Sequence, residues 1–142
     1  MKQLTLHLQR FRLMIANFVR LARVVRELGG DVHFEWPACC SLWKDPEVQS
    51  MIRELEMLDS RCDGCSLGVV AQRSAAAGQP IRKTWRVVPT SRIMAEAINE
   101  NKCPGPAIHP HHARREKSDT VKTWFYPPMF TDLTQCHGGG PA

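Results

Sequence analysis

The sequence has no apolar run of the roughly 18–20 residues that a membrane-spanning helix needs. Its start, Met1-Lys2, leads into an amphipathic segment rich in arginine, which differs from the apolar core and cleavage site of a signal peptide. We therefore expect no membrane partner and an intracellular location, in the cytoplasm or the nucleus, rather than secretion. In that reducing environment the six cysteines are expected to be free thiols or metal ligands, not disulfides.

The motifs of common nucleotide-binding and hydrolytic enzymes are also missing. The chain has neither the Gly-x-x-x-x-Gly-Lys-Ser/Thr phosphate loop nor the Gly-x-Ser-x-Gly nucleophile elbow. The pair Gly29-Gly30 follows an expected helix and precedes an expected strand, whereas a dinucleotide-binding loop requires the opposite order. We therefore expect no such cofactor and no catalysis by the chain on its own.

What is present is the composition of an ordinary globular protein. The 142 residues are 43% hydrophobic and 23% charged, which suits a single domain with a modest core. We expect that domain to cover residues 1–131 and a disordered tail to follow over 132–142. The net charge of +5 fits a nucleic-acid partner, although solubility alone would tolerate the same charge.

Hydrophobic periodicity predicts a long helix over 3–28, closed by Gly29-Gly30. Its apolar positions form one expected stripe, namely Leu4, Leu8, Phe11, Ile15, Phe18, Leu21, Ala22, Val25 and Leu28. Further helices are expected over 46–58 and 92–99, and strands over 32–36, 81–89 and 124–126. Another short strand is expected within 62–70, centred on 66–70. This order predicts an α/β domain, a small mixed sheet flanked by helices that is a Rossmann-like fragment.

The segment Val32–Pro37 is expected to carry Glu35 to the end of a buried strand, where open α/β sheets bind their ligands. A carboxylate there could act as a general base or hold a substrate. Alternatively, it caps the next loop or pairs with an arginine such as Arg86. Glu35 is thus the candidate pocket residue, and no catalytic residue is assigned.

A zinc module is an alternative function. Cys62 and Cys65 have the two-residue spacing that lets two thiolates share one zinc ion, and Gly64 permits the tight turn between them. Cys103 and His109 would supply the second pair of ligands. The competing interpretation is that the cysteines are buried and act as small hydrophobic residues.

Two basic segments are candidate nucleic-acid contacts. On a strand, Arg82 and Arg86 share one face with Thr84, while Lys83 lies on the other face with Trp85. An outward face of this kind suits phosphate groups, and a solvated strand face is the alternative interpretation. A second basic patch, which includes Arg114 and Arg115, follows several histidines.

Several blocks of residues together resemble a known family. They are, in order, Gly29–Pro37, Leu42-Trp43, Pro46-Glu47, Asp63–Cys65, Gly68, Pro80–Val87, Thr90-Ser91, Cys103 and His109. This series resembles a domain in copia-type retroelement polyproteins of dinoflagellates, from about residue 21 to residue 127. The resemblance implies a retrotransposon-derived domain to which no activity is assigned.

A more distant resemblance is to the second half of cytosine-5 DNA methyltransferases. In that family a Glu-Asn-Val strand end supplies the glutamate that binds the flipped cytosine, and the resemblance gives this role to Glu35. Arg82 or Arg86 would correspond to the later basic element. Trp36 stands where the family has asparagine, and neither a Pro-Cys nucleophile loop nor a cofactor loop precedes it. The resemblance therefore implies at most a fragment without its cofactor half.

Overall fold

The computed structural model describes residues 2–71 and 77–108, with side chains from residue 6 onward. Its elements follow one another along the chain as α1 (Lys2–Glu27), β1 (His33–Pro37), α2 (Pro46–Glu54), β2 (Ser60–Asp63), β3 (Thr84–Pro89) and α3 (Arg92–Glu100). Short 3-10 helices lie at Ser41–Lys44 and Gly64–Leu67. Within this part of the chain, no helix has the length and apolar character needed to cross a bilayer.

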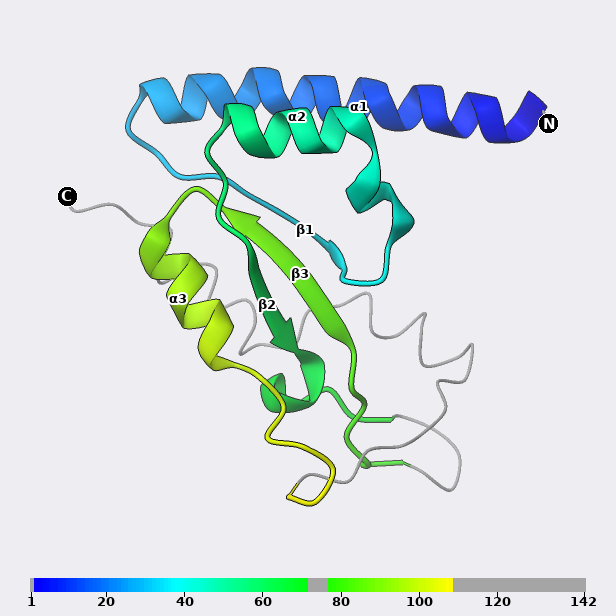
Figure 1. Ribbon diagram of the computed structural model, residues 1–142, viewed down its shortest axis with the longest axis vertical. Helices are drawn as coiled ribbons and strands as arrows, with labels where there is room; N and C mark the ends of the chain where they lie inside the picture. The colour runs from blue at the N-terminus through cyan, green and yellow to red at the C-terminus, as the bar shows by residue number, and fades with distance from the viewer. Residues whose placement is uncertain (1, 72–76, 109–142) are drawn as a thin grey trace.

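The three strands form one sheet in the order β1-β3-β2, so the last strand of the sequence is the central one. Both pairings are antiparallel, with Glu35 opposite Val87 and Cys62 opposite Trp85. Figure 1 shows α1 and α2 side by side at one end of the molecule and α3 alongside β2 and β3. The α/β class and the small sheet flanked by helices are confirmed.

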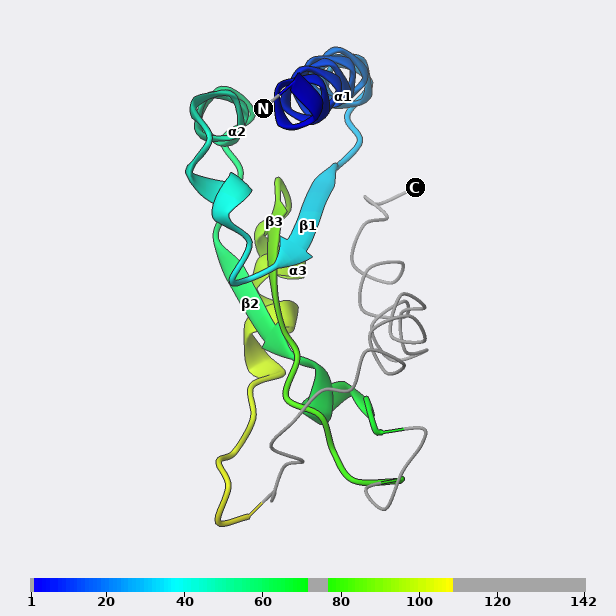
Figure 2. The same cartoon turned by 90° about the vertical axis from the view of Figure 1, so that its right-hand side faces the viewer.

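The sheet separates two hydrophobic cores. On one face α1 and α2 pack over Phe34, Trp36 and Val88, and the core includes the buried side chains of Trp43 and Met51. The second core lies on the face of α3 and consists of Cys62, Leu67, Val69, Ala71, Ile81, Trp85, Val87, Met94 and Ile98. In Figure 2, α1 and α2 lie above the strands, and α3 lies behind β2 and β3.

Local sequence signals explain where the helices begin and end. The Asp45 carboxylate accepts a hydrogen bond from the Glu47 amide at 2.9 Å, and Pro46 follows the cap as the first helical residue. Ser91 caps α3 in the same manner through the amide of Met94. The helix α1 ends at Glu27, and Gly29 closes its last turn with a φ of +80°, in the left-handed region that glycine favours. The expected helix starts at residues 46 and 92 and the expected glycine stop after the first helix are confirmed.

The short strand expected within 62–70 exists, but its expected centre at 66–70 is wrong. The second strand lies earlier, at Ser60–Asp63, and the chain then turns into a 3-10 helix. The turn is tight because Gly64 packs against Trp85, so that a Cβ atom at this position would lie 3.0 Å from the indole ring. Of the expected strand, only Val70 makes an isolated bridge, to Pro80.

Two further expectations need correction. The helix expected over 46–58 ends at residue 54, and Glu56 follows with a φ of +52°. The described sheet is not mixed, because both of its pairings are antiparallel, and it gives no support to a Rossmann-like arrangement. The strand expected over 124–126, the boundary at residue 131 and the tail over 132–142 lie outside the described residues.

Candidate functional site

Glu35 lies in the middle of β1 rather than at its end, because the strand continues to Pro37. Its side chain lies on the same face of the sheet as Val87. On that face, α3 packs against β2 and β3. Burial raises the pKa of Glu35, and the positive charge of Lys83 acts in the opposite direction. The structure therefore places a half-buried carboxyl beside a lysine.

The proposed pairing of Glu35 with Arg86 is not made. The register puts Arg86 opposite Trp36 and Arg61, on the other face of the sheet. There it forms an ion pair with Asp59, and its guanidinium carbon lies 4.6 Å from the centre of the Trp43 ring. With only 18% of its side chain exposed, Arg86 has a structural role between β3 and the aromatic core.

The other predicted nucleic-acid residues occupy different environments. Arg82 is 59% exposed and lies 3.5 Å from the Asp63 carboxylate. The Lys83 ammonium lies 4.9 Å from the centre of the Trp85 ring, on the opposite face from Arg86. The expected division of this segment between two faces is thus confirmed, but the segment does not form one basic surface. Arg114 and Arg115 lie outside the described residues.

Asp63 joins three segments of the chain. It is buried, and its carboxylate accepts hydrogen bonds from the Thr84 hydroxyl and, at 3.0 Å, from the Cys103 amide. Burial on its own would raise the pKa of Asp63, but these bonds and the charge of Arg82 lower it overall. The ionised carboxylate therefore fastens the segment after α3 to the end of β2.

The structure brings together two of the four predicted zinc ligands. The thiols of Cys65 and Cys103 share a hydrogen bond, and burial together with this bond raises the pKa of Cys65 to about 11. Cys62 lies in the α3 core, where burial and the charges of Asp63 and Glu35 raise its pKa to about 12. Across residues 2–71 and 77–108, no group of three or more His, Cys, Asp or Glu side chains is placed to hold a metal. His109 lies outside the described residues.

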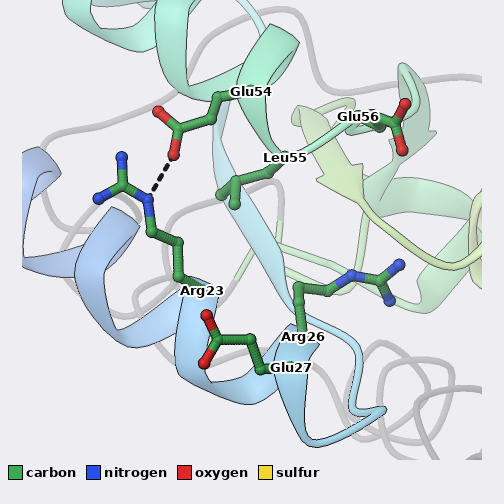
Figure 3. Close-up of a pocket in the computed structure, with 6 residues that line it drawn as sticks. All are labelled: Arg23, Arg26, Glu27, Glu54, Leu55 and Glu56. Atoms are coloured by element: carbon green, nitrogen blue, oxygen red, sulfur yellow. Dashed lines mark hydrogen bonds and ion pairs between the residues drawn. The ribbon is translucent and has the colours of Figure 1, made fainter.

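A groove of about 250 Å³ lies between α1 and α2 (Figure 3). The Arg23 guanidinium reaches across it to the Glu54 carboxylate, with a separation of 2.6 Å. The lining carries three acidic side chains and two arginines, namely Glu27, Glu54, Glu56, Arg23 and Arg26, together with Leu55. Because both signs of charge alternate around it, the groove does not favour a ligand of one charge.

The sequence interpretation missed how charge is distributed over the molecule. The segment of α1 contains six of the nineteen Lys and Arg residues and only one of the fourteen acidic residues. Its net charge of +5 equals that of the whole chain, so the remaining residues are neutral on balance. Arginine counts along the helix would have revealed this.

The expected single apolar stripe of α1 also needs correction. Ile15 and Ala22 are buried as expected, but Leu21 is 69% exposed and Leu28 is 83% exposed. These two leucines belong to a second apolar face that points to solvent. The signal was available in the sequence, since Leu13, Leu21, Val24 and Leu28 follow each other at helical spacing away from the buried positions.

Comparisons of the chain with protein-family models, curated proteins and solved structures find no match.

Proposed function

We propose that this protein is a non-catalytic domain that binds nucleic acid through the phosphate backbone, with α1 as its principal contact surface. One observation carries the proposal: the whole net charge of the chain resides on this one helix at the edge of the molecule. A basic stripe along a helix is the electrostatic footprint expected of a phosphate-binding surface. The resemblance to retroelement polyproteins belongs to the same proposal, because such proteins handle nucleic acid.

The arginines of α1 are accessible to phosphate groups. Arg10 and Arg20 are exposed and form no ion pair with any described residue. Arg12 and Arg23 are 53% and 55% exposed although each has a carboxylate neighbour. Because exposed ion pairs contribute only about 0–1 kcal/mol, a phosphate can compete for these guanidinium groups.

The spacing of these side chains suits an extended backbone. Arg10 and Arg20 lie ten residues apart, and the rise of about 1.5 Å per residue separates them by roughly 15 Å along the helix axis. Arg12 and Arg23 are separated by a similar distance on the neighbouring side. Phosphates several nucleotides apart would be held in register without contact to the bases, so we expect affinity with little sequence preference.

A lack of catalysis is consistent with the state of the candidate nucleophiles. The thiols of Cys62 and Cys65 have pKa values of about 12 and about 11, so both are protonated at neutral pH. A thiol must be ionised to attack a substrate. Burial also raises the pKa of Glu35, against the opposing charge of Lys83, so this carboxyl is harder to ionise than an exposed one.

The test is fluorescence anisotropy with a labelled 30-base-pair DNA duplex over a range of sodium chloride concentrations. We expect the logarithm of the binding constant to fall linearly with the logarithm of salt, by about 0.9 per phosphate contact. The double variant Arg20→Gln, Arg23→Gln should bind more weakly and lower that slope by about two.

The matched control is Arg92→Gln, which removes an exposed arginine from α3. It should leave both the affinity and the salt slope unchanged. Absence of binding at 50 mM salt, binding that does not respond to salt, or equal weakening by the control variant would each contradict the proposal.

A further inference from the structure

Six large hydrophobic side chains are exposed on α1 and on the residue that follows it. They are Leu6 (45%), Leu13 (65%), Met14 (48%), Leu21 (69%), Val24 (53%) and Leu28 (83%). In the rest of the described chain only Ile93 and Ile108 are large, apolar and similarly exposed. A contiguous apolar patch of this kind on a globular domain marks a contact surface.

Five of these side chains form one continuous line, which we call the outer stripe: Leu6, Leu13, Leu21, Val24 and Leu28, with Asn17 at its centre. At 3.6 residues per turn these positions fall within roughly 80° of the helix circumference. The stripe is about 33 Å long from its first to its last residue. It points away from Ile15 and Ala22, which are buried beneath the helix.

The outer stripe is symmetric about Asn17. Leu13 and Leu21 lie four residues before and after it, and Leu6 and Leu28 lie eleven residues before and after it. When two such helices run antiparallel with their asparagines facing, Leu13 of one copy lies against Leu21 of the other. Leu6 likewise lies against Leu28. Each Asn17 amide can donate to and accept from its counterpart.

We infer that the outer stripe of α1 is the interface of a homodimer, in which the two α1 helices pack antiparallel around a two-fold axis at Asn17. A two-fold interface requires a surface that is complementary to itself, and this stripe meets that requirement at its four leucines and at Asn17. A single asparagine among leucines is also the device that fixes register in helix pairs. This inference does not rest on nucleic-acid binding.

The positive charge of α1 opposes association of the two copies. Two helices with a net charge of +5 each repel one another, and the repulsion is screened beyond about 8 Å at physiological ionic strength. Arg10 interrupts the stripe at the level of Val24 of the second copy. In the dimer Arg10 therefore faces the second copy, and the phosphate contacts are left to Arg12, Arg20 and Arg23, which lie off the stripe. Within one turn of that position lies Glu27 of the second copy, the one acidic residue of the helix segment. Because the two net charges of +5 repel one another, we expect added salt to strengthen the dimer. This is the opposite of the effect of salt on phosphate binding.

An anionic lipid surface is the other occupant that an apolar helix with arginines would suit. A bilayer requires no match between individual positions, so the symmetry about Asn17 would then be without consequence. The second copy is favoured because it pairs the four leucines of the stripe and also uses its polar centre, Asn17.

Sedimentation velocity of the full chain between 5 and 200 µM provides the first test. We expect a concentration-dependent species of twice the chain mass of 16.1 kDa, with tighter association in 500 mM than in 100 mM sodium chloride. The variant Leu13→Glu, Leu21→Glu should be monomeric throughout. Ile93→Glu is the control, because it places one glutamate at a similarly exposed apolar position on α3 and should dimerise normally.

Cross-linking with a short bismaleimide tests the orientation. The variant Asn17→Cys should yield a covalent dimer in which the two introduced thiols are linked to each other, as identified by mass spectrometry. The variant Leu21→Cys should yield no link between its two introduced thiols, because each lies against Leu13 of the other copy.

Three results would overturn the inference: a wild-type monomer at all concentrations, a dimer that survives the double glutamate change, or a link between the two introduced thiols of Leu21→Cys. Binding of a monomeric protein to vesicles of phosphatidylcholine with 30% phosphatidylserine, lost in the glutamate variant, would overturn it in favour of the lipid surface.

Discussion

On the face of the sheet that α1 and α2 cover, aromatic rings fill the core, whereas the α3 face contains titratable groups. Phe34, Trp36 and Trp43 lie with ring centres 4.5–5.9 Å apart on the first face. On the second face, burial lowers the pKa of His33 and raises those of Glu35 and Cys62. All three shifts favour the neutral form. The aromatic face is thus fixed by packing, and the α3 face contains buried groups whose ionisation opposes folding.

The largest expected effect comes from removing the centre of the aromatic face. Trp43 is 4% exposed, contacts two other rings and supports the Arg86 guanidinium. We expect Trp43→Ala to lower the free energy of unfolding by about 3–5 kcal/mol, measured by urea denaturation. Ile93→Ala at an exposed site should change it by less than about 0.5 kcal/mol. If both variants lowered the free energy of unfolding equally, the aromatic core would not be the main source of stability on this face.

Asp63 connects the end of β2 to β3 and to the segment after α3. Asp63→Asn removes charge-assisted hydrogen bonds, which should cost about 1.5–3 kcal/mol of unfolding free energy. Because folding lowers the pKa of Asp63, its contribution is present above the unfolded pKa of about 3.9 and is lost as pH falls through the folded value. Urea midpoints of wild type and variant should therefore converge in acid, and a constant difference across pH would contradict this.

The smallest expected effect is that of Glu35→Gln, which should increase the free energy of unfolding. Because folding raises the pKa of Glu35, the folded state holds its proton more tightly, and stability falls as pH rises from the unfolded pKa through the folded one. Glu35→Gln keeps the shape without the charge and should gain about 0.5 kcal/mol at pH 7. Thermal melts at pH 4 and pH 7 measure this. If the variant were instead less stable at pH 7, the ionised carboxylate of Glu35 would stabilise the folded wild type, which contradicts this prediction.

Much of the fold could be predicted from local signals. The glycine that ends α1, the proline and aspartate that begin α2 and the serine that begins α3 all act within a few residues of their own position. The division of Arg82–Arg86 between two faces follows from the alternation of a strand and was also predicted. Periodicity alone was sufficient for these features.

The rest depended on contacts between distant residues. The 3-10 helix after β2 forms where Gly64 packs against Trp85. The residues around Gly64 in the sequence do not predict this contact. Arg86 forms its ion pair with Asp59 only because β2 pairs with β3. The candidate surface was missed for another reason, since a helix with apolar residues on two sides was interpreted as having one.

The position of β3 in the sheet has a consequence for how the chain folds. As the central strand, it is the only partner of both β1 and β2 in the described sheet, yet it is the last of the three to be synthesised. Until residue 89 has emerged, the aromatic side chains of β1 have no strand to pair with, and contacts this distant in sequence form slowly. A nascent chain that stops before residue 84 would expose these rings and aggregate, so the interval between β2 and β3 is the vulnerable period of biosynthesis.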